Sequence, residues 1–216
     1  MSIRDDLLAV ERRIADACAR AGRAREEVTL VAVSKTKPAE MIDEAIAAGV
    51  TEVGENRVQE ARDKRPLVRG SARWHLIGHL QSNKAKDAVR LFDVIQTIDR
   101  VELAEKVARA AAAAGKIQDV LLEVNVGNEP QKSGVAPGDV DALAKKVGSI
   151  EALKLRGLMA IPPAEDARRW FRNLRTLRDG LGLAELSMGM TDDFEMAIEE
   201  GATIIRVGRA IFGERG

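Results

Sequence analysis

Several chemically useful residues are scarce in this sequence, which contains one cysteine, two histidines and no tyrosine among 216 residues. The lone cysteine, Cys18, cannot form a disulfide within the chain. That usage is typical of a reducing compartment, so we expect a cytoplasmic protein. With one cysteine and no visible cluster of histidine and acidic residues, the sequence predicts no zinc or other metal site. The lack of tyrosine removes the phenolic hydroxyl from the groups available for acid–base catalysis.

Long apolar runs and an excess of one charge are absent too. No run approaches the ~20 apolar residues that span a bilayer, and residues 1–12 contain no apolar signal-peptide core. Lysine plus arginine and aspartate plus glutamate each total 34. This zero net charge argues against binding nucleic acid through bulk electrostatics, but it is compatible with a local basic pocket for a phosphate. We therefore expect neither a membrane nor a nucleic acid as a partner.

Short apolar runs alternate with longer helical patterns along the whole chain. Eight runs are predicted as strands, several of them continuously apolar as in parallel strands covered on both faces. They lie at 30–34, 52–54, 74–77, 94–97, 120–124, 155–159, 186–188 and 204–207. Helical patterns follow all but the last strand, at roughly 38–48, 57–65, 82–90, 101–114, 139–148, 164–180 and 192–200.

This alternation predicts the α/β class and, within it, a (β/α)8 TIM-type barrel. An extra N-terminal helix, about 3–21, precedes the first strand, and its expected apolar face is Leu7, Leu8, Val10, Ile14 and Cys18. No linker rich in proline, glycine or serine divides the chain, so we expect one domain over residues 1–216. A doubly wound open sheet is the alternative architecture.

Polar or small residues follow the predicted strands, where barrels of this type bind their ligands. They are Lys35, Glu55, Asn56, His79, Asp99, Asn125, Pro162, Thr191 and Gly208. Partial desolvation of Lys35 at the strand end would lower the pKa of its amine. A neutral amine forms imines with aldehydes. The alternative is an ordinary surface lysine at a strand end.

Two segments after the last two strands predict an anion site, because the corresponding loops form the usual phosphate site of this fold. In 187–193, either Thr191 or Asp192 caps the next helix or the first amides of that helix bind an anion. In 206–213, Gly208 allows close backbone approach, and the amides that follow can hold a phosphate.

Arg206 alternates with Val207 along the last strand, so it points into the barrel if Val207 packs against the helices. A buried guanidinium needs an acceptor. That acceptor is either an inward carboxylate such as Glu123, or a ring nitrogen or anion of a ligand. Of the two histidines, His79 is expected at the barrel mouth and His75 in the core.

Together these segments resemble the pyridoxal phosphate homeostasis protein family. The matching stretches run in family order across nearly the whole chain, at 33–38, 54–60, 74–84, 132–135, 156–160, 187–193 and 206–213. The resemblance implies a barrel related to the N-terminal domain of alanine racemases, with pyridoxal 5′-phosphate (PLP) held as a Schiff base on Lys35. It also implies that Arg206 lies near the pyridine nitrogen and that Asn56 and Met159 lie beside the ring or the mouth. The phosphate neighbours implied in the same way are Ser187, Gly189, Met190, Thr191, Gly208 and Arg209.

Three residues depart from the family pattern. Arg57 stands where tyrosine is frequent, His79 where proline is frequent, and Arg209 where threonine is frequent. The missing threonine hydroxyl puts one phosphate contact in doubt, whereas backbone amides do not depend on that side chain. Arg57 and Arg209 either add charge near the phosphate or face solvent.

The same features favour a carrier over an enzyme. An arginine beside the ring nitrogen stays cationic and disfavours ring protonation, which weakens the electron sink that PLP catalysis needs. Racemases of this barrel type use a tyrosine as a second base, and this chain has none. We expect a monomer that buffers PLP and delivers it to PLP-dependent apo-enzymes, with weak side reactions left open. We hypothesise that Lys132, on a loop at 127–138 expected to be mobile, relays the aldehyde. The alternative is a Schiff-base enzyme acting on amino acids or a small phosphorylated substrate.

Overall fold

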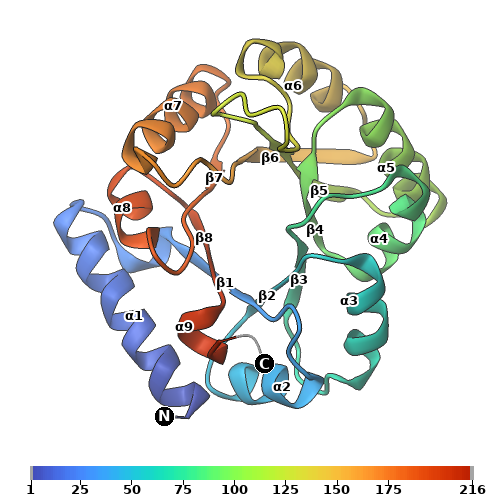
Figure 1. The fold of residues 1–216 in the computed structure, drawn as a ribbon. Helices are drawn as coiled ribbons and strands as arrows, with labels where there is room; N and C mark the ends of the chain where they lie inside the picture. Colours follow the sequence, from blue (N-terminus) through green and yellow to red (C-terminus); the bar gives the residue numbers. More distant parts are fainter. Residues whose placement is uncertain (1, 215–216) are drawn as a thin grey trace.

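Eight parallel strands close into a barrel that the helices surround (Figure 1). The computed structural model describes residues 2–214. The strands are β1 (Thr29–Val33), β2 (Glu52–Glu55), β3 (Arg73–Leu76), β4 (Val94–Ile98), β5 (Gln118–Glu123), β6 (Leu153–Met159), β7 (Glu185–Ser187) and β8 (Ile204–Val207). Because β1 pairs with both β2 and β8, the ring is closed. The predicted barrel is confirmed, and the open-sheet alternative is wrong.

The helices lie outside the strands. They are α1 (Ile3–Arg20), α2 (Ala39–Ala47), α3 (Val58–Lys64), α4 (Ala85–Leu91), α5 (Val101–Ala113), α6 (Val140–Gly148), α7 (Ala167–Gly180), α8 (Phe194–Glu199) and α9 (Arg209–Phe212). Short 3₁₀ turns lie at Arg25–Glu27, Arg65–Leu67, Ser82–Lys84 and Pro137–Asp139. The single turn of α9 was not predicted, because the last strand was expected to have no helix after it. None of the helices within residues 2–214 combines the length and apolar character that a bilayer crossing requires.

The N-terminal helix α1 begins at a capping box. The Ser2 hydroxyl accepts the Asp5 N–H at 3.2 Å, and the Asp5 carboxylate accepts the Ser2 N–H at 3.2 Å. Its buried face comprises Ile3, Leu7, Val10, Ile14, Ala17 and Cys18. Leu8 was expected on that face but is 49% exposed, because it lies about 100° around the helix from Leu7. The buried face packs α1 beside α8 and α9 (Figure 1).

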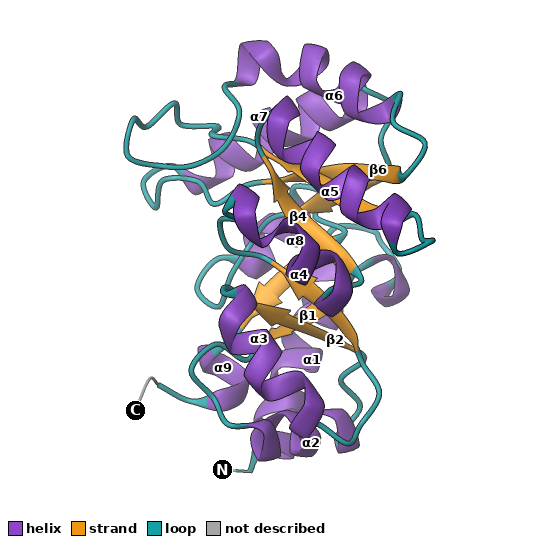
Figure 2. Cartoon of the chain, turned by 90° about the vertical axis from the view of Figure 1, so that its right-hand side faces the viewer, coloured by secondary structure: helices purple, strands orange, loops and turns teal. Residues whose placement is uncertain are grey.

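The interior of the barrel is filled by an apolar cluster, which we call the apolar floor. It consists of Val31, Val94, Leu121, Met159 and Ile204, all of them buried. Side chains alternate along a strand, so Ala32 and Ile205 point the other way and pack under the helices. Figure 2 shows these strands enclosed by helices when seen from the side. Because the floor fills the middle of the barrel, a ligand cannot pass through it and must bind at an end, which in barrels of this type is the carboxyl end of the strands.

Candidate functional site

A cavity of about 470 Å³ opens at the carboxyl end of the barrel. Its walls are Val33, Lys35, Lys37, Asn56, Ile77, Ile161, Met190, Thr191, Asp192, Arg206, Gly208, Arg209, Phe212, Gly213 and Glu214. Seven of the ten predicted site residues are among them. The other three lie behind the wall. Met159 belongs to the apolar floor, and Ser187 and Gly189 contact Arg206.

Lys35 enters the cavity from the turn that ends β1. The turn is tight, since Thr36 has a positive φ of 65° and the Lys37 N–H donates to the Ser34 carbonyl at 3.0 Å. The Lys35 side chain is half-buried and lines the cavity. Lys37 also lines it, and its ammonium donates to the carbonyl of Glu214 at 2.6 Å. Sequence reasoning did not include Lys37 in the site.

A polar network anchors the turn that carries Lys35. The Ser34 hydroxyl donates to Glu55 at 2.6 Å, and the Lys64 ammonium donates to the Ser34 carbonyl at 2.8 Å and to Glu55 at 2.9 Å. Lys64 also pairs with Glu60 at 2.6 Å, and Glu60 accepts the N–H of Thr36. Burial raises the pKa of Glu55, against the lowering effects of Ser34 and Lys64. The network fixes the backbone on both sides of Lys35.

Sequence reasoning missed Lys64 and Glu60. Their spacing of four residues indicates a helical ion pair, but that pattern is common on solvated helix faces. Only the packing of α3 against β2 shows that the pair faces the end of β1.

Arg206 points into the barrel, as predicted, while Val207 packs outward among the core side chains. Arg206 is 3% exposed, and its guanidinium donates to the Ser187 hydroxyl at 2.7 Å and to the Ala160 carbonyl at 2.9 Å. The described residues include no ion pair between Arg206 and Glu123, so a neighbouring carboxylate is not its direct acceptor. Burial lowers the pKa of Arg206 to about 10, against the opposing charges of Asp193 and Glu123. Arg206 is therefore cationic at neutral pH.

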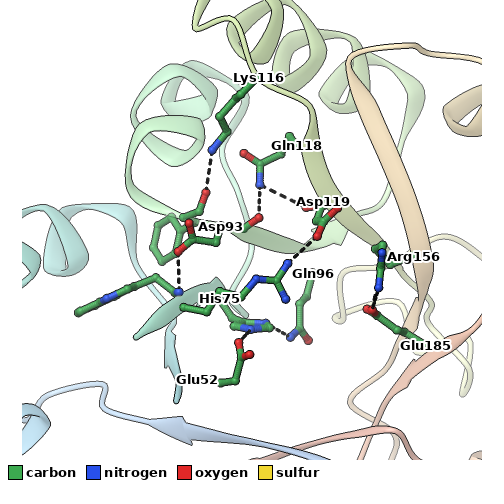
Figure 3. A network of polar contacts seen from close by, with 12 residues as sticks. Glu52, His75, Asp93, Gln96, Lys116, Gln118, Asp119, Arg156 and Glu185 are labelled. Carbon is green, nitrogen blue, oxygen red and sulfur yellow. Dashed lines mark hydrogen bonds and ion pairs between the residues drawn. The ribbon is translucent and has the colours of Figure 1, made fainter. Parts of the chain in front are cut away.

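A chain of hydrogen bonds continues from Arg206 through the barrel interior. The Ser187 hydroxyl donates to the Gln96 side-chain oxygen at 2.6 Å, and the Gln96 amide lies 2.8 Å from Nδ1 of His75. Nε2 of His75 lies 2.5 Å from the Glu52 carboxylate. Figure 3 shows His75 between these two partners. His75 is 2% exposed with both ring nitrogens engaged, so the prediction of a satisfied core histidine is confirmed.

The segment after β7 differs from the predicted helix cap. The residue that precedes α8 is Asp193, and its carboxylate accepts the Met190 N–H at 2.6 Å. The expectation that Thr191 or Asp192 caps the helix is therefore wrong. Glu195, in the first turn of α8, pairs with Arg13 on α1 at 2.8 Å. Within residues 2–214, the backbone N–H groups of Thr191 and Asp192 donate to no acceptor.

Gly189 joins the segments after β7 and β8. Its φ is +90°, and an added Cβ would lie 2.5 Å from the Cβ of Ala197, so the position requires glycine. Its carbonyl accepts the backbone N–H of Arg206 at 3.0 Å. The same contact holds the Arg206 backbone against the segment that contains Met190 and Thr191. At the start of α9, the amides of Arg209 and Ala210 have no intrahelical acceptor, and they follow Gly208 in the cavity wall.

The two arginine departures behave differently. The Arg209 guanidinium pairs with Asp192 and lies 3.7 Å from Glu214, so it bridges the segments after β7 and β8 at the cavity wall. Arg57 is exposed and does not line the cavity. Arg209 therefore lies beside the cavity with its charge compensated by Asp192, whereas Arg57 lies away from the cavity.

The loop after β5 folds back over the barrel end. The Asn125 amide donates to the Glu129 carbonyl at 2.8 Å, and the Val135 N–H donates to the Glu123 carbonyl at 2.8 Å. Lys132 pairs with Glu129 at 2.5 Å and lies 3.4 Å from the carbonyl of Ile161, a residue of the cavity wall. The loop expected to be mobile is thus tied to β5 at several points, with Lys132 at the rim of the cavity.

A second polar cluster lies at the ends of β3, β4 and β5. It contains His79, Asp99 and Glu123, whose ligand-capable atoms all lie within 4.8 Å of one another. Burial raises the pKa of Glu123 to about 7, and the nearby Asp99 carboxylate adds to this effect while Arg206 opposes it. The sequence showed no such cluster, because its members are separated along the chain and meet only when the barrel closes.

Comparisons with known proteins agree with this architecture. The family model described as "Alanine racemase, N-terminal domain" matches residues 6–216. The pyridoxal phosphate homeostasis protein of Aquifex aeolicus is 44% identical over 226 residues, covering 100% of this chain and 99% of its own. The structure of PipY from Synechococcus elongatus, with PLP bound, is 39% identical with a TM-score of 0.83, covering 93% of this chain and 100% of that chain. An alanine racemase of Clostridium difficile is 15% identical with a TM-score of 0.80, covering 99% of this chain and 56% of that chain, and shows the shared fold.

These similarities define the class as the barrel of an alanine racemase N-terminal domain. The relatives that match over their full length define a narrower family within this class. The chain belongs to the family of pyridoxal phosphate homeostasis proteins. The family resemblance predicted from the sequence is therefore confirmed.

The network behind Lys35 generates a stability prediction. Replacing Lys64 with Met leaves the buried Glu55 without its cation, so the variant should lose about 3 kcal/mol of unfolding free energy in urea. Adding Glu55→Gln to that variant should recover part of the loss, because the unpaired charge is removed. Lys145→Met is the control, since Lys145 is 76% exposed in its side chain and its ion pair is with Asp141 on the same helix. Strictly additive effects of the two substitutions would contradict the network.

The buried carboxyl of Glu123 generates a pH prediction. Its pKa rises from 4.5 to about 7 on folding, so the native protein loses stability as pH increases through that interval. Glu123→Gln removes this loss, and the variant should gain on the order of 2 kcal/mol at pH 8. The gain should vanish below pH ~4.5, where both states hold the proton. Urea unfolding with a metal chelator present measures it, and an equal gain at both pH values would refute the assignment.

Proposed function

We propose that this protein binds PLP as a Schiff base on Lys35 and buffers or delivers the cofactor. The observation that carries the proposal is the meeting of Lys35 and Arg206 in one cavity, between the segments after β7 and β8. Two relatives support it. PipY was solved with PLP bound, and the Aquifex aeolicus protein is named a pyridoxal phosphate homeostasis protein.

The cavity wall offers a partner for each functional group of PLP. The Lys35 amine faces the cavity for the aldehyde, and the Arg206 guanidinium is a donor for the ring nitrogen. Thr191 and Asp192 provide backbone N–H groups without acceptors within residues 2–214, and the Arg209 guanidinium, which pairs with Asp192, is a further donor for the phosphate. Met190, whose N–H is taken by Asp193, contributes its side chain instead. When bound, PLP supplies a reactive aldehyde and a conjugated ring.

The remaining predicted residues have supporting roles in this proposal. Ser187 accepts from Arg206 and thereby orients it, and Gly189 holds the Arg206 backbone. Gly208 allows the segment after β8 to approach the end of β1, since an added Cβ would lie 3.1 Å from the Val33 carbonyl oxygen. Asn56 lines the cavity near Lys35, and Met159 forms the floor beneath it.

A carrier explains the site better than a catalyst does. Arg206 remains cationic at neutral pH because its pKa is about 10, and a cation beside the ring nitrogen disfavours the protonated ring that stabilises carbanions. The chain has no tyrosine to act as a second base. The proposal therefore assigns no strong catalysis to the protein. It includes the cytoplasmic location, the monomeric state and the acceptor apo-enzymes expected from the sequence.

Lys132 is the proposed relay for delivery. Its ammonium lies at the rim, next to the carbonyl of Ile161 in the cavity wall, and pairs with Glu129. The amine is accessible from solvent, because the side chain is 32% exposed. In this proposal, a cofactor that leaves Lys35 passes the Lys132 amine at the rim of the cavity.

The first test is the visible spectrum of the purified protein. After incubation with PLP, the wild type should turn yellow, and borohydride should bleach the colour and fix the adduct on the peptide containing Lys35. Lys35→Ala should lose the visible band entirely. Lys37→Ala is the matched control, since Lys37 lines the same cavity and should leave the band in place. An undiminished band in Lys35→Ala would remove the basis of the proposal.

The second test concerns transfer. Lys132→Ala loaded with PLP should activate a PLP-dependent apo-enzyme roughly tenfold more slowly than the wild type, because a positioned amine is replaced by exchange through solvent. Lys145→Ala, on the exposed face of α6, is the control. The measurement is the recovery of acceptor activity over time. Transfer at the wild-type rate would eliminate the relay and leave PLP binding untouched.

A further inference from the structure

His79, Asp99 and Glu123 come from three neighbouring segments at the carboxyl end of the barrel. His79 follows β3, Asp99 follows β4, and Glu123 is the last residue of β5. None of the three lines the cavity that contains Lys35. They therefore form a separate group on the other side of the barrel mouth, which the proposed PLP site does not use.

Glu123 shows that this group is incomplete by itself. The residue is 8% exposed, and its Oε2 atom is buried without a hydrogen-bond partner within residues 2–214. A buried carboxylate oxygen without a donor is costly. One carboxylate oxygen of Glu123 lies within 4.8 Å of ligand atoms on Asp99 and His79, so this buried side chain reaches the cluster.

The other two members have suitable atoms and access. Arg100 donates to Oδ1 of Asp99 at 2.5 Å, while Oδ2 of Asp99 lies 3.8 Å from Nδ1 of His79. Two ligands of one small cation lie about 3–4 Å apart when each bond is about 2.1 Å. His79 is 47% exposed in its side chain, so an ion can enter from solvent and keep water ligands. The Ser133 hydroxyl, 3.2 Å from Nδ1 of His79, would give way or remain as an outer contact.

We propose that His79, Asp99 and Glu123 bind one divalent transition-metal ion at the barrel mouth. One imidazole with two carboxylates suits Mn²⁺ or Zn²⁺, whereas Mg²⁺ and Ca²⁺ prefer oxygen ligands alone. The two carboxylates offset the ion's charge, and the positive charges of Arg100 and Arg206 nearby oppose binding. This site reverses the sequence-based expectation of no metal, which rested on the absence of a ligand cluster along the chain.

The experiment uses the full chain after treatment with a chelator. Titration with Mn²⁺, followed by the electron paramagnetic resonance signal of the free ion, and with Zn²⁺ by calorimetry should give one saturable site per chain. Binding of Mg²⁺ should be at least tenfold weaker. Both His79→Ala and Glu123→Gln should weaken Mn²⁺ binding at least tenfold. Asp141→Asn is the control for surface acids, because Asp141 is 62% exposed in its side chain on α6.

The design separates this proposal from the one for PLP. Lys35→Ala should bind Mn²⁺ as tightly as the wild type does, because Lys35 contributes no ligand, and it excludes chelation by bound PLP. His79→Ala tests the site independently of the buried position, since the His79 side chain is 47% exposed. Thermal melting of each variant checks its fold. Absence of saturable binding up to ~1 mM Mn²⁺, or equal affinity in His79→Ala and Asp141→Asn, would overturn the site.

Discussion

The buried guanidinium of Arg206 is the constraint on which the rest of the barrel mouth depends. A cation with 3% exposure must find acceptors inside the barrel, and it takes the Ser187 hydroxyl from β7 and the Ala160 carbonyl after β6. Ser187 in turn requires Gln96, and Gln96 contacts His75. One charged side chain on β8 thus sets the orientation of polar groups on three other strands, β7, β4 and β3. Replacing any member would leave another without its partner.

The mouth of the barrel has two chemically distinct halves above one apolar floor. The half formed by β1, β2, β7 and β8 presents amines, guanidinium groups and backbone N–H donors, and the carboxylates of Asp192 and Glu214 lie beside Arg209. The half formed by β3, β4 and β5 presents the carboxylates of Asp99 and Glu123. Arg206 interacts electrostatically with both halves, because the charges of Asp193 and Glu123 each favour its protonated form. Within residues 2–214, neither Asp193 nor Glu123 forms a direct ion pair with Arg206.

The elements predicted correctly are those whose signal is local. The strands are short apolar runs, and the inward direction of Arg206 follows from simple alternation with Val207. The features missed depend on contacts between distant segments. Lys64 pairs with Glu60 within one helix, and its contact with Ser34 appears only when α3 lies beside the end of β1. The turn at α9 is four residues long, too short to show a helical period.

The position of Glu214 has a practical meaning for anyone attaching another polypeptide to this protein. Its carbonyl is bound by Lys37, and the residue forms part of the cavity wall. A reporter peptide inserted directly after Glu214 would start at the entrance through which a small molecule must pass. An insertion at this position would therefore hinder measurements of uptake and release.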